Sequence, residues 1–158
     1  MTKSYYKGWM AKMNIYFICT GNTCRSPMAE AILNNKQIAN LEVRSAGIYA
    51  MEGGGMSENA KRALEREGIS HHHRSQLVTP ENIEWADLVL TMTATHKDIV
   101  LKQFPHIEDK LYTLKEYVTP YSAIDVSDPY GGDLSIYLQT YQELTKYIDL
   151  LEGKIMGK

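Results

Sequence analysis

The sequence predicts a single α/β domain built on a doubly wound sheet of about four parallel strands, with helices on both faces in the flavodoxin-like manner. Two observations predict this fold class. Short runs of apolar, β-branched or aromatic residues alternate along the chain with segments that carry apolar residues at helical spacing. In addition, no repeat, linker or low-complexity segment divides the 158 residues, an ordinary length for one domain.

The first elements are a strand, a loop and a helix, followed by a second strand. Residues 15–18 (Ile-Tyr-Phe-Ile) form a continuous apolar run, as expected for a strand buried on both faces of a parallel sheet. Pro27 suits the first turn of a helix, and apolar residues at helical spacing extend this helix to about Asn40. Residues 41–45 then indicate a second strand that ends at the Ala-Gly pair 46–47.

The middle of the chain repeats this alternation. Glycines 53–55 predict a mobile loop, Ser57 is placed to cap a helix, and Gly68 closes that helix. A third helix is expected to start at residues 79–80 (Thr-Pro), and residues 87–92 predict a third buried strand.

The last third holds one more strand and two helices. Residues 94–104 predict a helix and residues 110–114 a short fourth strand, whereas residues 118–133 mix proline, glycine and acidic residues without a period. We interpret this aperiodic segment as a functional loop. A long terminal helix follows, and its apolar stripe consists of Tyr137, Tyr141, Leu144, Ile148, Leu151 and Ile155.

Composition excludes several classes of protein. Apolar residues make up 44% of the chain and charged residues 23%, close to the averages for globular proteins. No stretch approaches the roughly 20 apolar residues that a membrane span needs. The net charge of −2 indicates no basic surface for nucleic acid or anionic lipid. We therefore expect neither nucleic acid nor a membrane as partner. The oligomeric state stays open in the sequence, with a monomer as the favoured state.

The ends and the cysteines bear on cellular context. Cys19 and Cys24 lie five positions apart, which makes a poor disulfide framework, and the N-terminus lacks the apolar region of a signal peptide. We therefore expect a cytoplasmic protein. Residues 1–12 fit no period, and we interpret them as an N-terminal extension before a domain of residues 13–158. A non-native remnant, an upstream start and a flexible native arm all stay open as its origin.

The loop after the first strand has the features of a phosphate-binding site. It runs from a strand into a helix N-terminus, where backbone N–H groups and the helix dipole favour negative charge. Gly21 lets the backbone approach closely, Asn22 tolerates a left-handed conformation, and Arg25 offers a planar fork for two phosphate oxygens. No Walker-type Gly-x4-Gly-Lys-[Ser/Thr] motif occurs, which excludes that form of nucleotide binding.

Cys19 opens this loop and is the predicted nucleophile. The dipole, the loop amides and Arg25 are expected to stabilise its thiolate, and the hydroxyl of Ser26 can donate to the sulfur. The alternative is a buried structural cysteine in an ordinary turn. The order of Cys, Gly, Asn, Arg and Ser along one loop argues against this alternative.

A covalent phosphoenzyme mechanism also needs an acid for the leaving group and a base for water. Asp128 is the candidate, because Pro129 stiffens the backbone beside the carboxylate and the following glycines let the chain turn. Asp125 is the competing carboxylate, and we interpret it as a solvated loop residue.

Residues 19–30 (CTGNTCRSPMAE), together with Asp-Pro-Tyr at 128–130, resemble the low-molecular-weight protein tyrosine phosphatase family over about residues 13–151. Within it the chain is most similar to the bacterial protein-arginine phosphatases, which share Thr23 and the pattern YTLKEYV at 112–118. Tyrosine-specific relatives usually have isoleucine at the position of Thr23.

The resemblance implies a phosphatase that forms a phosphocysteine intermediate, requires no metal or organic cofactor and acts on phosphorylated proteins, with a bacterial protein-arginine kinase supplying arginine-phosphorylated substrates. It agrees with the roles inferred above. It also implies that Asn22, Ser45 and His73 form a hydrogen-bond network that supports the loop. Without it, the histidines 71–73 would indicate a solvated turn, with metal binding less favoured. The complete prediction comprises catalytic Cys19, Arg25 and Asp128, phosphate-binding or pocket-lining Thr20, Gly21, Asn22, Thr23, Cys24, Ser26 and Tyr130, and loop-supporting Ser45 and His73.

Thr23 bears on the choice of substrate. Threonine and isoleucine have similar shapes, but the hydroxyl is a polar handle suited to a hydrated guanidinium, whereas isoleucine suits a tyrosine ring. We therefore expect phosphoarginine to be preferred, with phosphotyrosine as the alternative, since Tyr130 can equally stack on a tyrosine ring.

Three further questions stay open in the sequence. Cys24 is either ordinary packing or a resolving thiol that pairs with oxidised Cys19. Arsenate reductases share a similar loop, but they relay oxidation through further cysteines, and the chain has only two. A non-catalytic phosphate-binding module is the rival from another class, and the set of nucleophile, clamp and acid argues against it.

Overall fold

A computed structural model describes residues 12–119 and 125–157 as a three-layer α/β domain. The sheet holds β1 (Met13–Cys19), β2 (Leu41–Gly47), β3 (Leu88–Thr91) and β4 (Leu111–Thr113) in the order β2-β1-β3-β4. All three neighbouring pairs are parallel. The predicted fold class is confirmed.

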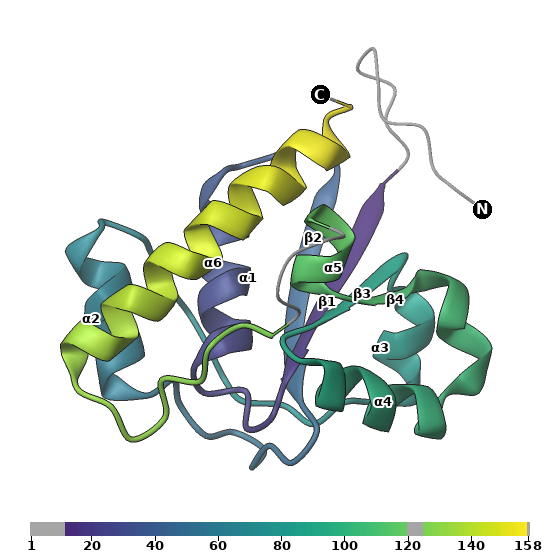
Figure 1. Cartoon of the computed structure of the whole chain (residues 1–158), viewed down its shortest axis with the longest axis horizontal. Helices are drawn as coiled ribbons and strands as arrows, with labels where there is room; N and C mark the ends of the chain where they lie inside the picture. The colour runs from purple at the N-terminus through teal and green to yellow at the C-terminus, as the bar shows by residue number, and fades with distance from the viewer. Residues whose placement is uncertain (1–11, 120–124, 158) are drawn as a thin grey trace.

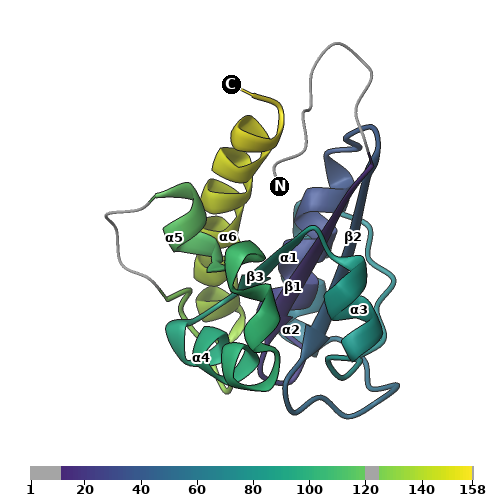
Figure 2. The ribbon, with the colours of Figure 1, turned by 90° about the vertical axis from the view of Figure 1, so that its right-hand side faces the viewer.

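Helices cover both faces of the sheet (Figures 1 and 2). On one face lie α1 (Arg25–Asn35), α2 (Glu58–Arg66), α5 (Leu114–Val118) and α6 (Leu134–Ile155), with α1, α2 and α5 all contacting α6. On the other lie α3 (Pro80–Trp85), α4 (Ala94–Gln103) and the 3-10 helix η1 (Pro105–Lys110). Two hydrophobic cores result, one on each side of the sheet.

The central strand β1 explains why both cores form. Ile15 and Phe17 pack into the core beneath α1 and α6, whereas Tyr16 and Ile18 pack into the core beneath α3 and α4. All four side chains are fully buried. Because alternate residues of a strand point to opposite faces, an unbroken apolar run is what a strand covered on both faces requires.

The helix after the first loop is shorter than its sequence indicates. The predicted end at about Asn40 is wrong, since α1 ends at Asn35 and both Gln37 and Asn40 adopt left-handed φ angles of 53° and 61°. Asparagine tolerates this conformation, which turns the chain back into β2. The helix also begins two residues before Pro27, at Arg25.

Other boundaries agree with prediction or add short elements. Gly68 (φ 71°) follows the end of α2, and the predicted stripe of the terminal helix is buried in α6. Helix α5 was not predicted, although its capping box from Thr113 to Glu116 stands in the sequence. The glycines at 53 and 54 exchange backbone hydrogen bonds with Ser75.

Two predictions fall partly on residues outside those described. The interpretation of residues 1–12 as an extension lies outside the description except for Lys12, which pairs with Glu42 at 3.1 Å. Residues 120–124 of the predicted functional loop are likewise not described. None of the helices among the described residues combines the length and the apolar character that a membrane span requires.

Candidate active site

The site lies at the carboxyl end of β1, which separates β2 from β3 in the sheet, so the strand order reverses between β1 and β3. Cys19 is the last residue of β1, and the loop of residues 20–24 leads from it into α1. The loop passes so close to Gly47 that a Cβ there would lie 2.6 Å from the Thr20 carbonyl oxygen and 2.7 Å from the Asn22 nitrogen. A glycine at the end of β2 is therefore needed for the loop to close over the strand ends.

Asn22 is the internal support of this loop. It is fully buried, has a left-handed φ of 56°, and its side-chain amide donates to Ser26 Oγ and Ser45 Oγ, each at 2.9 Å. Its Oδ1 accepts from the backbone nitrogen of Gln76 at 2.9 Å. The side chain thus satisfies its hydrogen bonds inside the protein, which stabilises the strained backbone.

The backbone carbonyl of Asn22 is held as well. It lies 2.6 Å from His73 Nε2 and 2.8 Å from Ser75 Oγ, both of which donate to it. Burial lowers the pKa of His73, against the effect of this hydrogen bond. The structure therefore brings Asn22, Ser45 and His73 together. It adds three supports that the sequence did not reveal: Ser75, the backbone of Gln76, and Glu30, whose carboxylate accepts from Ser45 at 2.5 Å.

Cys19 is enclosed by the loop, with 3% of its surface exposed, and its sulfur lies 2.8 Å from Ser26 Oγ. Burial raises the pKa of the thiol, while hydrogen bonds from Ser26 and the loop amides and the charge of Arg25 lower it. The expected donors are all present, yet the net direction is upward. The thiolate therefore depends on these donors, because the apolar enclosure by itself disfavours it.

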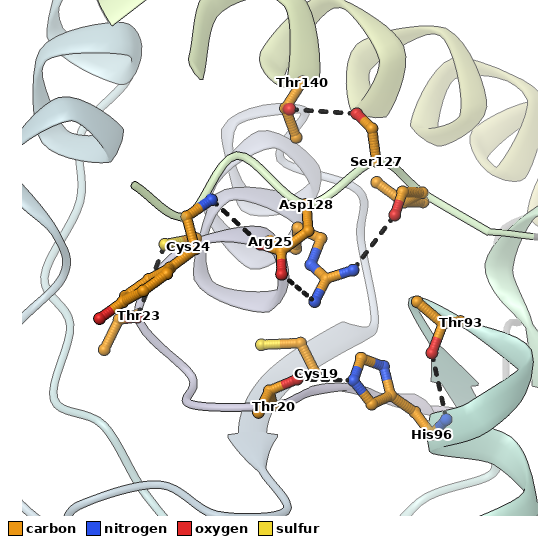
Figure 3. A network of polar contacts seen from close by, with 12 residues as sticks. Cys19, Thr20, Thr23, Cys24, Arg25, Thr93, His96, Ser127, Asp128 and Thr140 are labelled. Atoms are coloured by element: carbon orange, nitrogen blue, oxygen red, sulfur yellow. Dashed lines mark hydrogen bonds and ion pairs between the residues drawn. The ribbon is translucent and has the colours of Figure 1, made fainter. Parts of the chain in front are cut away.

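Arg25 and Asp128 lie next to each other in the site, above Cys19 in the view of Figure 3. The guanidinium is buried, and its Nη1 donates to the Val126 carbonyl at 3.1 Å, which fixes the plane of the fork. Its Nη2 lies 3.6 Å from Asp128 Oδ2. The other carboxylate oxygen, Oδ1, accepts from the backbone nitrogen of Tyr130 at 3.1 Å. Asp128 is thus oriented toward the pocket while remaining open to solvent.

Cys19, Arg25 and Asp128 line a common cavity of about 220 Å³. The predicted pocket residues Thr23 and Tyr130 belong to its wall, and Tyr130 is 81% exposed. Asp125, the competing carboxylate, instead accepts from the backbone nitrogen of Ala94 at the start of α4. The full lining is Cys19, Thr20, Gly21, Thr23, Cys24, Arg25, Asp128 and Tyr130.

Cys24 is buried beside α6. Its sulfur lies 3.3 Å from the hydroxyl of Tyr137 and donates to Ser57 Oγ at 3.5 Å. Both cysteines are free thiols. Cys24 therefore has a structural role in packing the loop against α2 and α6, whatever its redox chemistry.

Sequence reasoning missed His96, which lies below the site on α4 (Figure 3). Its Nε2 is 2.8 Å from Thr20 Oγ1, and its buried Nδ1 has no hydrogen-bond partner within the described part of the chain. Burial and the charge of Arg25 lower its pKa to about 4, so the ring is neutral near pH 7. A single histidine in a helical pattern carries no signal that could have identified this contact.

No group of three or more His, Cys, Asp or Glu side chains that could hold a metal ion occurs among residues 12–119 and 125–157. The arrangement instead places a thiol, a buried guanidinium and an exposed carboxylate around one small cavity. Such a set can bind a phosphoryl group, attack it and protonate the group that leaves.

Comparison with known proteins identifies relatives of this arrangement. Residues 14–156 match the model of the family described as low molecular weight phosphotyrosine protein phosphatase. A protein-arginine-phosphatase of Geobacillus stearothermophilus is 47% identical over 141 residues, which cover 89% of this chain and 95% of that protein. The solved structure of the YwlE arginine phosphatase from that organism has a TM-score of 0.89 at 46% identity, covering 92% of this chain and 94% of its own.

Two further relatives bear on chemistry and substrate. A YwlE arginine phosphatase mutant with serine in place of cysteine was solved with its active-site serine phosphorylated. It has a TM-score of 0.87 at 45% identity, covering 90% of this chain and 95% of its own. The low molecular weight protein-tyrosine-phosphatase PtpB of Staphylococcus aureus is 38% identical over 136 residues, covering 86% of this chain and 94% of its own.

Proposed function

The chain belongs to the low molecular weight phosphotyrosine protein phosphatase family and is a cysteine-dependent protein phosphatase, and we propose that it removes phosphate from arginine side chains of proteins. The observation that carries this proposal is the wall of the pocket. Thr23, with its hydroxyl, lines the same cavity as Cys19, Arg25 and Asp128. Residues 13–158 form the proposed phosphatase domain.

In the first step, Cys19 reacts as the thiolate, its proton having been lost to solvent, and its Sγ attacks phosphorus in line with the bond to the leaving guanidine nitrogen. Arg25 and the loop amides bind the phosphoryl oxygens, and Asp128, as a carboxylic acid, gives its proton to that nitrogen. The P–N bond breaks, an S–P bond forms, and a neutral nitrogen leaves. The position of Asp128 Oδ2, 3.6 Å from Arg25 Nη2, supports this role, because it faces the pocket from the side opposite Cys19.

In the second step, water attacks the phosphocysteine. The Asp128 carboxylate takes the proton of the water, and the S–P bond breaks to release inorganic phosphate. The hydroxyl of Ser26, 2.8 Å from the sulfur, stabilises the departing thiolate. A relative whose active-site serine is phosphorylated supports a covalent intermediate at this position.

Phosphotyrosine is the alternative substrate, and the exposed ring of Tyr130 at the pocket rim favours it. The hydroxyl of Thr23 favours phosphoarginine, because a polar wall can bind water or an N–H of the guanidine, whereas a tyrosine ring prefers an apolar wall. After the proton transfer the guanidine also offers N–H donors to the Asp128 carboxylate, a contact that a tyrosine leaving group does not offer.

The test compares kcat/KM for a phosphoarginine peptide and a phosphotyrosine peptide of the same sequence in the wild type, in Thr23→Ile and in Thr23→Val. Thr23→Ile is expected to shift the ratio toward phosphotyrosine by at least about tenfold, since one apolar-for-polar wall change is worth roughly 1–3 kcal/mol. Thr23→Val removes the hydroxyl with less added bulk and separates polarity from size. An unchanged ratio in both variants would reject the role of Thr23 in substrate choice, and a wild-type enzyme that prefers the phosphotyrosine peptide would reject the arginine assignment. Cys19→Ser is the inactive reference.

The cellular location of the enzyme and the redox chemistry of its two cysteines belong to the same proposal. A catalytic thiol must stay reduced, so we place the enzyme in the cytoplasm, acting as a monomer on proteins phosphorylated by a protein-arginine kinase. Oxidised Cys19 condenses with Cys24 in a reversible disulfide, which protects the nucleophile from further oxidation. Both thiols are free and both line the same cavity, which supports this pairing.

A further inference from the structure

Glu143, on the inner side of α6, lies outside the pocket but contacts the loop that carries Asp128. Its Oε1 accepts two hydrogen bonds from Ser127, from the backbone nitrogen at 3.2 Å and from Oγ at 2.7 Å. The Ser127 hydroxyl in turn accepts from the buried Thr140 at 3.2 Å (Figure 3). The residue immediately before Asp128 is therefore bound to α6 through both its backbone and its side chain.

The other oxygen of Glu143 is held by a buried cation. Its Oε2 lies 2.5 Å from Lys115 Nζ on α5, and the Lys115 side chain is only 8% exposed and packs over the ring of Tyr147. Burial tends to raise the pKa of Glu143, but the bonds from Lys115 and Ser127 outweigh it and lower the pKa overall. The carboxylate is thus fixed as an acceptor on both oxygens.

The same loop is anchored on its other side by Val126. Its backbone nitrogen donates to the Met92 carbonyl at the end of β3 at 2.9 Å, and its carbonyl accepts from Arg25 at 3.1 Å. Two consecutive residues before Asp128 are therefore tied to three different elements. Asp128 itself is 56% exposed and only 3.6 Å from Arg25, so its position depends on the backbone that precedes it.

We propose that Glu143 is a positioning residue for the reaction: it holds the backbone at Ser127 so that Asp128 meets the leaving group. This inference rests on the proposed role of Asp128 as general acid. A proton donor must lie within hydrogen-bond reach of the leaving atom, and a displacement of about 1 Å can cost up to about 10²-fold in rate. Glu143 and Lys115 form no part of the pocket lining, so they act on catalysis only through the loop.

The experiment uses Glu143→Gln in the full chain. Glutamine offers one oxygen and one NH2 group, so it sets a donor against either Lys115 or Ser127 and breaks one anchor. Values of kcat/KM are measured with phenyl phosphate, whose leaving group needs a proton, and with p-nitrophenyl phosphate, whose leaving group hardly needs one. We expect a loss of about tenfold with the first and about twofold with the second.

Ser127→Ala is the second variant, because it leaves the buried Lys115–Glu143 pair intact and removes only one of the two bonds to the loop. It should show the same dependence on the leaving group with a smaller loss. Glu152→Gln is the matched control on α6: it removes a 3.1 Å ion pair with Lys36, away from the loop. This control should leave both substrates unchanged.

A double variant of Asp128 and Glu143 distinguishes a failure of this inference from a failure of the proposed function. If Glu143 acts through Asp128, the double variant Asp128→Asn, Glu143→Gln should lose no more kcat/KM for phenyl phosphate than Asp128→Asn alone, within about twofold. Equal losses on both substrates, or a double variant whose losses multiply, would overturn the positioning role. If Asp128→Asn itself shows no dependence on the leaving group, the assignment of the general acid fails as well, which is a distinct result.

Discussion

The buried imidazole of His96 makes the stability of the fold depend on pH, and His96→Gln is the substitution that isolates this dependence. Glutamine can keep a side-chain N–H directed at Thr20 Oγ1, where His96 Nε2 now lies at 2.8 Å, but it does not titrate. Protonating the ring would place a cation beside Arg25 in a site that offers the proton on Nδ1 no acceptor among the described residues.

The sign and size of this pH dependence follow from the pKa values of His96 in the folded and unfolded states. The folded pKa of His96 is lowered from 6.5 to about 4 by burial and by Arg25, whereas the unfolded chain keeps the ordinary value. The unfolded state therefore binds the extra proton first, and stability that is fully present above pH 6.5 is lost as pH falls toward 4. At pH 5 the loss is about 2 kcal/mol, from 1.36 kcal/mol per unit. Solvent screening of a ring that is not completely buried reduces this loss to about 1–2 kcal/mol.

The assay is urea unfolding of wild type and His96→Gln at pH 7.5 and pH 5.0. Wild type should lose about 1–2 kcal/mol more than the variant between the two conditions. Other shifted groups, among them His73 with a lowered pKa and Glu30 with a raised one, titrate in both proteins and cancel in the comparison. Identical losses in the two proteins would show that His96 is not held neutral by the fold.

Three further outcomes are expected. Gly47→Ala should reduce phosphatase activity by at least about 10²-fold and lower the unfolding free energy by about 1–3 kcal/mol, because its Cβ would meet loop backbone atoms at 2.6–2.8 Å. Gly55→Ala, whose Cβ meets nothing within 4 Å, is the matched control, and equal effects would refute the steric argument. Asn22→Ala should cost about 2–4 kcal/mol in thermal or urea unfolding, since its left-handed backbone loses three side-chain hydrogen bonds; a loss below about 0.5 kcal/mol would contradict its supporting role. Cys24→Ala should make peroxide inactivation of Cys19 less reversible by thiols, and equal recovery would argue against the disulfide.

The fold was predictable because its signals are local and repeated. The run at residues 15–18 identifies a strand buried on both faces, and the stripe of the terminal helix identifies its buried side. The end of α1 was not predictable in the same way. Ala39 continues the apolar spacing, but the chain must reverse before Leu41, and the left-handed Gln37 and Asn40 make that turn.

The residues of the candidate site fall into the same two groups: some have local sequence signals, and others are placed only by tertiary packing. Residues of the loop could be predicted because one segment carries them in a fixed order, and Asp128 because proline and glycines surround it. His96, Ser75 and Glu143 come from separate elements, and they reach the site only through tertiary packing. Gln76 acts through its backbone, so no side chain could have identified it.

The enclosure of Cys19 has two opposed consequences, and their balance bears on what the site stabilises best. Burial raises the pKa of the thiol, while Ser26, the loop amides and Arg25 lower it. The same exclusion of water strengthens every hydrogen bond to an anion within the pocket. On the proposed mechanism, negative charge passes from the sulfur to phosphoryl oxygens that the amides and Arg25 bind together. We infer that these donors are matched less to the free thiolate than to the transition state, where the charge is spread over several acceptors at once.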